Sequence, residues 1–385
     1  MARAARPKRG CSDRRVEKRQ YEVGVPRDDE GRILRETARV GTAVYDIVRR
    51  ALRNERRVPG ADAGPPGRPF EGYGSRENYI SRRVTETGHG SAIEGTRVWC
   101  FVPENLRDGS RAPVIVYLHG FRASAPNVYW EHIHHLTAQG YVVLFPRFQK
   151  GGVIGLFNDN DQREMVERAI SATHNGLQQV ADVVDLDQLY VFGHSLGGLI
   201  GACWNGVGAP AARGLVLAHP SITTDQIPEF ARRFITCVEW EGLVAENSAP
   251  AILLGGDQDT LAPPHETLAL AAAMTGAASV ATYIARADDH GVPAFRTGHM
   301  ASARTDSGAL RWVGEALGGN QAQDTLQARF YHAALDAMLA GDFTPALDFG
   351  NWSDGVVVNP PLVETRAPIK PKRRTRSRAS KRKSQ

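Results

Sequence analysis

The chain has 385 residues, 42% hydrophobic and 23% charged, a composition that favours one large folded core with extensions. It contains no run of about 18 apolar residues, which argues against a transmembrane segment. The arginine-rich first twenty residues lack the apolar stretch of a secretory signal, so a cytoplasmic location is expected for the sequence as written. The four cysteines show neither metal-binding nor disulfide spacing.

Positive charge is concentrated at the two ends of the chain. Residues 1–20 carry +6 and residues 366–385 carry +10, so a total of +5 leaves −11 for residues 21–365. The Lys/Arg/Ser-rich end is expected to be a disordered basic tail. Such a tail could hold nucleic acid or another anionic surface by charge alone, although it has no aromatic residues to stack on bases.

The composition also suggests how the chain is divided. A helical spacing of apolar residues over 36–52 precedes a Pro/Gly-rich linker at 58–69. The expected segments are a partly disordered N-terminal extension (1–70), a main domain (71–320), a C-terminal helical extension packed on it (321–365) and a basic disordered tail (366–385).

Short apolar runs alternate with helical patterns through the main domain. Apolar runs rich in β-branched residues indicate buried strands, and longer stretches with helical spacing indicate helices. The strands are expected at 79–84, 96–102, 114–118, 141–145, 189–192, 214–218, 251–255 and 280–285, and the helices at 128–139, 161–180, 199–204, 265–274, 310–317 and 325–339. This alternation predicts an α/β fold with right-handed crossovers and a mostly parallel sheet.

The helix predicted over 128–139 carries three histidines, His132, His134 and His135. Their spacing could suit a metal ion, but no carboxylate or cysteine partner is evident nearby in the sequence. They are expected to lie on an exposed or half-buried face of the helix.

The strand predicted over 189–192 leads into a Gly-x-Ser-x-Gly sequence centred on Ser195. A strand, a sharp turn with a serine and a helix are typical of a nucleophile elbow. A Cβ at Gly193 or Gly197 is expected to clash in so tight a turn. The elbow would place Ser195 at a helix N-terminus, where free N–H groups favour negative charge. The alternative at this motif is a glycine-rich turn without catalytic function.

A His-Gly-Phe sequence, residues 119–121, follows the strand predicted over 114–118. The glycine permits a turn after which the N–H of Phe121 can point at a carbonyl oxygen, and the N–H of Leu196 would be the second donor of an oxyanion hole. His119 is expected to bond to backbone and to support this loop rather than to transfer a proton.

A carboxylate after the strand predicted over 251–255 would complete a serine-based triad, since acids follow the serine in this chain order. Asp257 and Asp259 both lie there. The acid would fix the tautomer of a histidine and stabilise its charged form.

The histidine of such a triad is expected just after the strand predicted over 280–285. His290 lies there, and His299 is a second candidate further along the same loop. Position favours His290, which would take the proton of Ser195 and return it to the leaving group.

Residues 95–317 resemble the α/β-hydrolase superfamily, and within it the dienelactone-hydrolase-like and cutinase-like esterases. The resemblance rests on residues 119–121, residues 193–197, Gly256-x-x-Asp259 and His290-Gly291, in the family's order. The family pattern Gly-x-x-Asp-x-x-x-Pro favours Asp259 as the acid and leaves Asp257 to brace the loop. The resemblance implies an α/β-hydrolase fold, with a central, mostly parallel sheet and helices on both faces.

The resemblance further implies that residues 71–320 are the catalytic domain of a serine hydrolase that cleaves small carboxylic esters through an acyl-enzyme. The expected site is the triad Ser195, Asp259 and His290 with the oxyanion donors Phe121 and Leu196, and neither a cofactor nor a metal is expected. Peptides, lactones and thioesters are alternative substrates for the same constellation. The alternative function is a non-catalytic protein of this fold that binds nucleic acid or an anionic surface through its basic tails.

Overall fold

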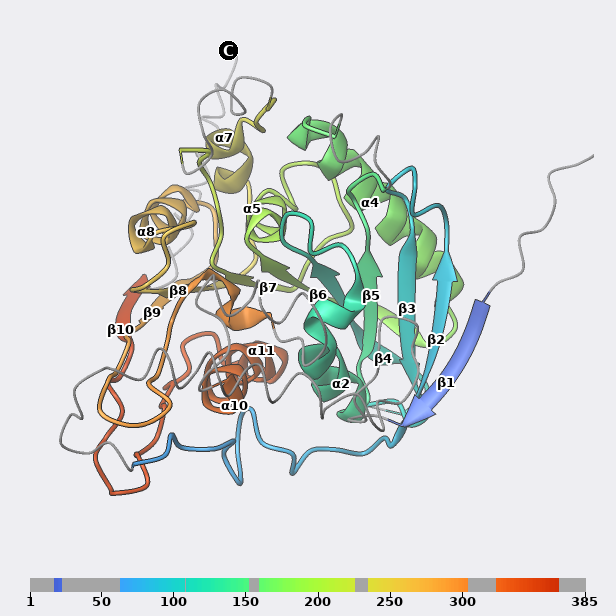
Figure 1. Cartoon of the computed structure of the whole chain (residues 1–385). Coiled ribbons are helices and arrows are strands. Elements are labelled where there is room, and N and C mark those ends of the chain that lie inside the picture. The colour runs from blue at the N-terminus through green and yellow to red at the C-terminus, as the bar shows by residue number, and fades with distance from the viewer. Residues whose placement is uncertain are drawn as a thin grey trace, which may run out of the picture.

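The computed structural model of the chain describes residues 17–22, 63–107, 109–151, 159–225, 235–303 and 323–366. Within these ranges, ten strands form one sheet in the order β1-β2-β3-β5-β4-β6-β7-β8-β9-β10 (Figure 1). The strands are β1 (Glu17–Glu22), β2 (Arg83–His89), β3 (Val98–Pro103), β4 (Ala112–Leu118), β5 (Val142–Pro146), β6 (Val184–His194), β7 (Gly214–Ala218), β8 (Ala251–Gly256), β9 (Val280–Ala285) and β10 (Leu362–Arg366).

The middle of the sheet is parallel and its two sides are antiparallel. Strands β5, β4, β6, β7, β8 and β9 pair in parallel, whereas β1, β2 and β3 on one side and β10 on the other pair antiparallel. The predicted α/β fold with a mostly parallel sheet is therefore confirmed.

Helices cover both faces of the sheet (Figure 1). One face carries α4, α5, α7 and α8, and the other carries α2 and the helical segment from α10 to α11. The helical elements are η1 (Pro126–Tyr129), α2 (Trp130–Ala138), α4 (Gln162–Gln179), α5 (Leu196–Ala202), α7 (Trp240–Ala245), α8 (Pro264–Ala273), η2 (His299–Ser302), α10 (Gln323–Leu326), the π-helical turn η3 (Gln327–His332) and α11 (Ala333–Leu339).

Each face of the sheet has its own apolar core, because successive side chains of a strand point to opposite faces. In β4, Val114 and Val116 pack with α4 and α5, whereas Ile115 and Tyr117 pack with α2 and α11. Every residue of β4 is buried, as expected for a central parallel strand. The strand ends that carry the candidate site are thus fixed from both sides.

Some predicted elements differ from the structure. Strands β1 and β10 were not predicted, and β2 begins at Arg83 rather than at residue 79. The helix predicted over 325–339 is interrupted by η3. The helices predicted over 36–52 and 310–317, residues 58–62 of the predicted linker and nearly all of the basic tail lie outside the described residues. The boundaries of the four segments stay predictions.

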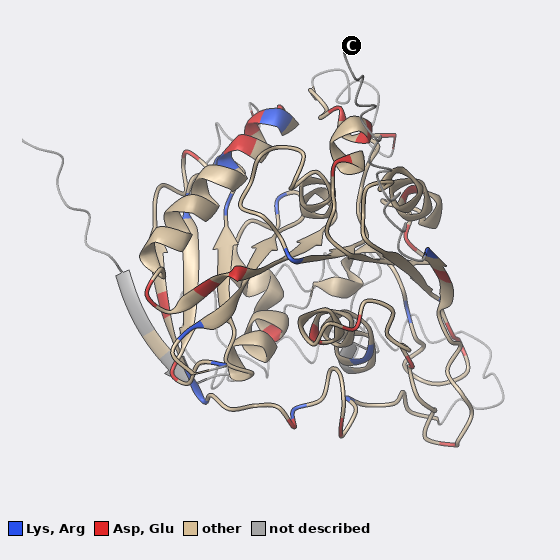
Figure 2. Cartoon of the chain, turned by 180° about the vertical axis from the view of Figure 1, so that it is seen from behind, with Lys and Arg blue, Asp and Glu red and all other residues tan. Residues whose placement is uncertain are grey.

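The start of α4 carries interspersed acidic and basic residues (Figure 2). Asp161 caps the helix by accepting a hydrogen bond from the N–H of Arg163. Arg168 pairs with the buried Asp159 and with Glu164. These contacts hold the N-terminus of α4 next to the loop that follows β5. None of the helices in the described ranges is long and apolar enough to cross a membrane.

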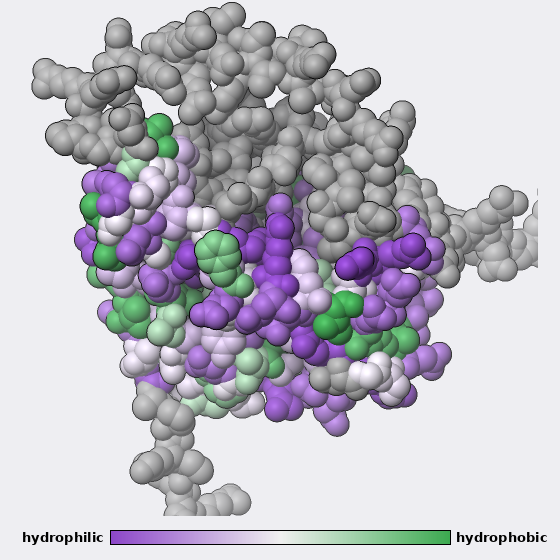
Figure 3. All heavy atoms as spheres, turned by 90° about the horizontal axis from the view of Figure 1, so that it is seen from below, coloured by the Kyte–Doolittle hydropathy of each residue, from purple (hydrophilic) through white to green (hydrophobic). Residues whose placement is uncertain are grey.

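Residues 63–82 run in an extended path across the face of the molecule shown in Figure 3, beneath α2 and α11. Apolar residues on the described part of this face are separated by polar ones (Figure 3). Phe70, for example, is 99% exposed. The segment is therefore attached to the body mainly by polar contacts rather than by an apolar core.

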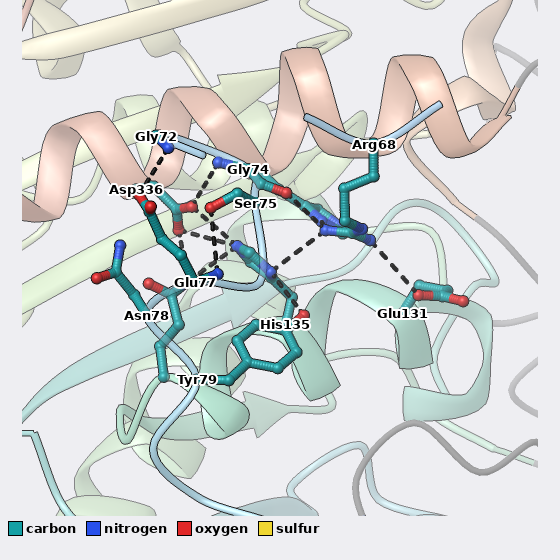
Figure 4. Close-up of polar contacts among 12 residues, drawn as sticks. Arg68, Gly72, Gly74, Ser75, Glu77, Asn78, Tyr79, Glu131, His135 and Asp336 are labelled. Atoms are coloured by element: carbon teal, nitrogen blue, oxygen red, sulfur yellow. Dashed lines mark hydrogen bonds and ion pairs between the residues drawn. The ribbon is translucent and has the colours of Figure 1, made fainter. Parts of the chain in front are cut away.

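A buried polar network makes this attachment (Figure 4). Asp336 of α11 accepts hydrogen bonds from the N–H of Gly74 at 2.8 Å, from Nε2 of His135 at 2.9 Å and from Nε2 of Gln139 at 2.7 Å. Arg68 lies 3.2 Å from Nδ1 of His332, whose ring stacks on that of His135. The network joins residues 63–82 to α2 and α11.

This network corrects one sequence expectation. His132, His134 and His135 were expected on an exposed or half-buried face, but all three are buried between α2 and the elements packed on it. The carboxylate that His135 contacts is Asp336, 201 residues away in the sequence. Local sequence could not have indicated this partner.

Asp336→Ala is expected to lower the free energy of unfolding by about 3 kcal/mol, because it leaves three buried donors without their acceptor. Denaturant unfolding would measure the loss, with the exposed Asp182→Ala as the control that changes stability by less than about 0.5 kcal/mol. Equal stability of the two variants would contradict the role given to this network.

Candidate active site

The serine of the Gly-x-Ser-x-Gly motif lies in a strained turn between β6 and α5. Ser195 has φ +56° and ψ −120°, a conformation that residues other than glycine rarely adopt. Its N–H donates to the carbonyl of Ala218 at 2.9 Å, which ties the turn to the end of β7. The strand, sharp turn and helix predicted for this stretch are all present, with α5 starting at Leu196.

The two motif glycines are required by close backbone contacts, as the sequence predicted. A Cβ on Gly193 would lie 2.3 Å from the carbonyl oxygen of Gly197, and a Cβ on Gly197 would lie 2.3 Å from that of Leu118. Backbone atoms cannot move aside as a flexible side chain can. Any larger residue at either position would displace Ser195 from the edge of the sheet.

Ser195 is joined to a histidine and a carboxylate by a continuous chain of hydrogen bonds. Its Oγ donates to Nε2 of His299 at 2.8 Å, and Nδ1 of His299 donates to Oδ2 of Asp259 at 2.8 Å. The three side chains are almost completely buried, with 7%, 6% and 3% of their residue surfaces exposed for Ser195, His299 and Asp259. This is the geometry in which a histidine can accept the proton of an attacking serine.

The structure does not bring His290 to Ser195, so the predicted contact between these two side chains is wrong. Nε2 of His290 donates to Asp354 at 2.7 Å, and its ring lies beside Trp352. An antiparallel bridge between Asp288 and Phe295 folds the loop back after β9. The loop then returns to the sheet edge only at η2, whose first residue is His299.

Asp259, the acid favoured over Asp257, lies at the end of β8 and accepts four hydrogen bonds. Its Oδ1 accepts from the backbone N–H groups of Leu261 and Ala262, and its Oδ2 accepts from His299 and from a second histidine, His219. Burial alone would raise the pKa of Asp259, but the two histidine donors outweigh it and hold this pKa well below the ordinary value.

Asp257 points away from this group. Its Oδ1 accepts from the hydroxyl of Thr297 at 2.6 Å and from the N–H of Ala287 at 3.0 Å. It therefore braces the loop between β9 and η2, and contributes no described contact to Ser195 or to His299.

The loop at residues 119–121 lies against the elbow. A Cβ on Gly120 would lie 3.3 Å from the Cβ of Ser195, so the two segments touch here. The N–H groups of Phe121 and Leu196, the expected oxyanion donors, bond to no other group in the described part of the chain. Each follows directly in the chain on one of the two residues in contact, Gly120 and Ser195, a position that suits an oxyanion hole.

His194, the residue before Ser195, links the loop at residues 119–121 to His299. The N–H of Gly120 donates to the oxygen of Tyr129, whose hydroxyl donates to Nδ1 of His194 at 2.8 Å. Nε2 of His194 in turn donates to the backbone carbonyl of His299 at 3.0 Å. Burial, with His299 and His219 nearby, holds the pKa of His194 well below its ordinary value, so the ring stays neutral.

His119 has the supporting role expected of it. Its ring stacks on Phe148 with centres 3.9 Å apart, and its Nδ1 donates to the carbonyl of Gly120 at 2.8 Å. Burial lowers the pKa of His119 to about 3, so this side chain stays neutral and holds the loop.

His219, Asp259 and His299 are also the one described group of side chains compact enough for a metal ion, with one candidate ligand atom from each within 4.8 Å of the others. The two histidine nitrogens lie 2.7 and 2.8 Å from the same carboxylate oxygen, which are hydrogen-bond lengths. A metal would have to displace both ring protons and break the contact that orients His299. The donor set suits a hydrogen-bonded chain better than a metal centre.

Sequence patterns did not indicate His219 or Tyr331, and they favoured His290 over His299 as the histidine that contacts Ser195. His219 directly follows β7, so its position at a strand end was visible. Tyr331, which donates to His219, is 112 residues away in the chain, and no local pattern connects the two.

No protein-family model and no curated protein matches the sequence. Solved structures of bacterial esterases are similar in fold. Est1E from Butyrivibrio proteoclasticus is 16% identical with a TM-score of 0.41, over 60% of this chain and 95% of that one. Esterase B from Lactobacillus rhamnosis is 17% identical with a TM-score of 0.40, over 64% of this chain and 80% of that one. At this identity and TM-score, the likeness says nothing of the activity or substrate of this chain.

Proposed function

We propose that the chain is a serine hydrolase that cleaves carboxylic esters through an acyl-enzyme. One observation carries the proposal: Ser195, on a strained turn at a sheet edge, is joined through His299 to Asp259 by hydrogen bonds of 2.8 Å each. Assignment to the dienelactone-hydrolase-like or cutinase-like branch, and a preference for small esters, stay predictions.

In the first half of the reaction, Oγ of Ser195 forms a bond to the carbonyl carbon of the ester, and its proton passes to Nε2 of His299. The carbonyl oxygen becomes an oxyanion, which the N–H groups of Phe121 and Leu196 stabilise. The tetrahedral intermediate then breaks its bond to the alcohol oxygen, and His299 returns the proton to that oxygen. The alcohol leaves and the acyl group stays on Ser195.

In the second half, water attacks the acyl carbon while His299 takes one of its protons. The bond to Ser195 breaks, His299 returns the proton to Oγ, and a carboxylic acid is released. Throughout, Asp259 holds Nδ1 of His299 and stabilises the positive charge that the ring carries transiently.

The first test is hydrolysis of p-nitrophenyl esters of increasing acyl length, together with labelling by a fluorophosphonate. Ser195→Ala is expected to lose the label and to lower turnover by about 10⁴–10⁶-fold. Ser221→Ala is the matched control, because this neighbouring serine bonds through Oγ to the carbonyl of Thr223 and is expected to keep both activities. A wild-type protein that is inert to both reagents would contradict the proposed function.

Binding of nucleic acid or an anionic surface remains a separate prediction for the basic tail. Residues 367–385 lie outside the described residues, and the charge of the tail is the observation that favours it. Truncation after residue 365 would abolish salt-sensitive binding to a polyanion without changing ester turnover.

A further inference from the structure

A second histidine shares the carboxylate of the candidate triad. Nδ1 of His219 donates to Oδ2 of Asp259 at 2.7 Å, the same oxygen that accepts from His299 at 2.8 Å. Nε2 of His219 accepts a hydrogen bond from the hydroxyl of Tyr331 at 2.6 Å. The hydrogen-bonded chain that starts at Ser195 therefore does not end at Asp259 but continues across it to Tyr331.

His219 and Tyr331, the two residues that extend the hydrogen-bonded chain beyond Asp259, both have uncommon backbone conformations. His219 has φ +48°, a left-handed conformation that costs free energy for a residue other than glycine. Tyr331 lies in the π-helical turn η3, a rare element that is frequent at functional sites. The two residues meet in the hydrogen bond from the phenol of Tyr331 to the imidazole of His219.

Burial fixes the protonation states along this chain. His219 and Tyr331 are completely buried. Burial lowers the pKa of His219, although Asp259 opposes the shift, and burial raises the pKa of Tyr331 well above its ordinary value. A neutral imidazole and a neutral phenol allow one arrangement of donors: the hydroxyl donates to Nε2, and Nδ1–H donates to the carboxylate.

His219 is not a second base for Ser195. Its Nε2 is occupied by Tyr331, and its ring centre lies 5.8 Å from that of His299. Any effect of His219 on the serine must therefore pass through Asp259 and His299.

We propose that His219 and Tyr331 are positioning residues for the triad acid: they hold Asp259 in place and keep it ionised, so that it orients His299. The inference rests on the proposed function and deepens it. It predicts that the effective acid is the unit of Asp259, His219 and Tyr331 rather than one carboxylate.

Two substitutions at position 219 distinguish the effect of the hydrogen-bond donor of His219 from the effect of its packing. His219→Asn keeps an N–H near the position of Nδ1, and asparagine tolerates the left-handed backbone. His219→Leu fills a similar space without a donor. We expect His219→Leu to lower kcat by about 10–100-fold with KM changed by less than about threefold, and His219→Asn to lower kcat by less than about tenfold. Tyr331→Phe, which leaves the backbone at His219 untouched, is expected to lie between wild type and His219→Leu.

The pH profile distinguishes positioning from packing. The titratable groups that face Asp259 are His219 and His299, with Tyr331 behind His219 and the His194 ring 6.2 Å from that of His219. Without the His219 donor, the carboxylate binds a proton more readily and attracts the charged form of His299 more strongly. Both effects move the acid limb of kcat/KM to higher pH in His219→Leu. In His219→Asn the limb should stay in place.

Imidazole N–H protons bonded to a carboxylate give resolved low-field proton NMR lines, which report the geometry without any substrate. Because His135 and His290 also donate to carboxylates, we expect the test to lie in the difference: His219→Leu should lack one of the wild-type lines, that of His219, with circular dichroism confirming that the variant folds. If the wild type shows the line that His219→Leu lacks but hydrolyses no ester, the proposed function fails while the shared carboxylate stands. Wild-type kcat in His219→Leu, or a uniform loss with an unmoved acid limb, would overturn the inference.

Discussion

Replacing His299 with alanine is expected to lower ester turnover by about 10⁴–10⁶-fold, whereas His290→Ala should leave it within about threefold. The difference follows from the contacts of the two rings. Nε2 of His299 lies 2.8 Å from Oγ of Ser195, while Nε2 of His290 donates to Asp354. Only the first ring can take the proton of the serine when the ester carbonyl is attacked.

The measurement is kcat and KM for one p-nitrophenyl ester with both variants side by side. Added imidazole should partly restore turnover in His299→Ala, since a small base can enter the space left by the ring, and it should have no effect on His290→Ala. Loss of activity in His290→Ala with retention in His299→Ala would reverse the assignment. Loss in both would indicate that the loop after β9 needs the contact between His290 and Asp354 to hold η2.

Local sequence predicted the parts of the site that lie within a few residues of a strand end. Ser195 and Asp259 each follow a continuous apolar strand, and parallel strands bring their carboxyl ends to one edge of the sheet. Gly193 and Gly197 could be interpreted because their constraint is local, a turn too tight for a Cβ. The order of strands and helices followed from the same apolar runs.

The histidine could not be located in this way, because its position depends on the path of a loop. Between β9 and η2 the chain folds back on itself through the bridge of Asp288 with Phe295. His290 is drawn to Asp354, 64 residues further on, and that contact has no counterpart in a local pattern. Position beside the last strand therefore favoured a residue that does not contact Ser195.

Local sequence likewise did not indicate Tyr331 or the strands that lie at the two edges of the sheet. Tyr331, which contacts His219, lies in a π-helical turn that interrupts a helix whose apolar spacing looked regular. Strand β10 is largely exposed and lies at an edge, so it lacks the continuous apolar run of a buried strand. These features are decided by tertiary contacts that no short window of sequence contains.

Asp259→Asn is expected to lower kcat by about 10⁴-fold, and the hydrogen bonds around the carboxylate explain why. Oδ1 accepts from the N–H groups of Leu261 and Ala262, so the amide oxygen of asparagine must occupy that side. Its NH₂ group then faces His219 and His299, where two N–H donors already point. His299 must give up the proton on Nδ1 and carry it on Nε2, and that nitrogen can no longer accept the proton of Ser195.

Asp257→Asn is the matched control. The Oδ1 of Asp257 accepts from Thr297 and Ala287, and an asparagine oxygen can keep both bonds, so turnover should stay within about threefold of wild type. The measurements are ester turnover and the rate of fluorophosphonate labelling, since the wrong tautomer should slow both by a similar factor. A fast-labelling Asp259→Asn with normal turnover would exclude Asp259 as the acid.

The pH dependence of the wild type gives a further check on the same carboxylate. Hydrogen bonds from His219 and His299 hold the pKa of Asp259 below its ordinary value, against the effect of burial. A carboxyl with a lowered pKa stabilises the fold above the ordinary aspartate pKa of about 4, and this stabilisation is lost only as the pH falls toward the lowered value. Asp259 should therefore stay ionised while activity falls on acidification, so the acid limb in the wild type does not report this carboxyl.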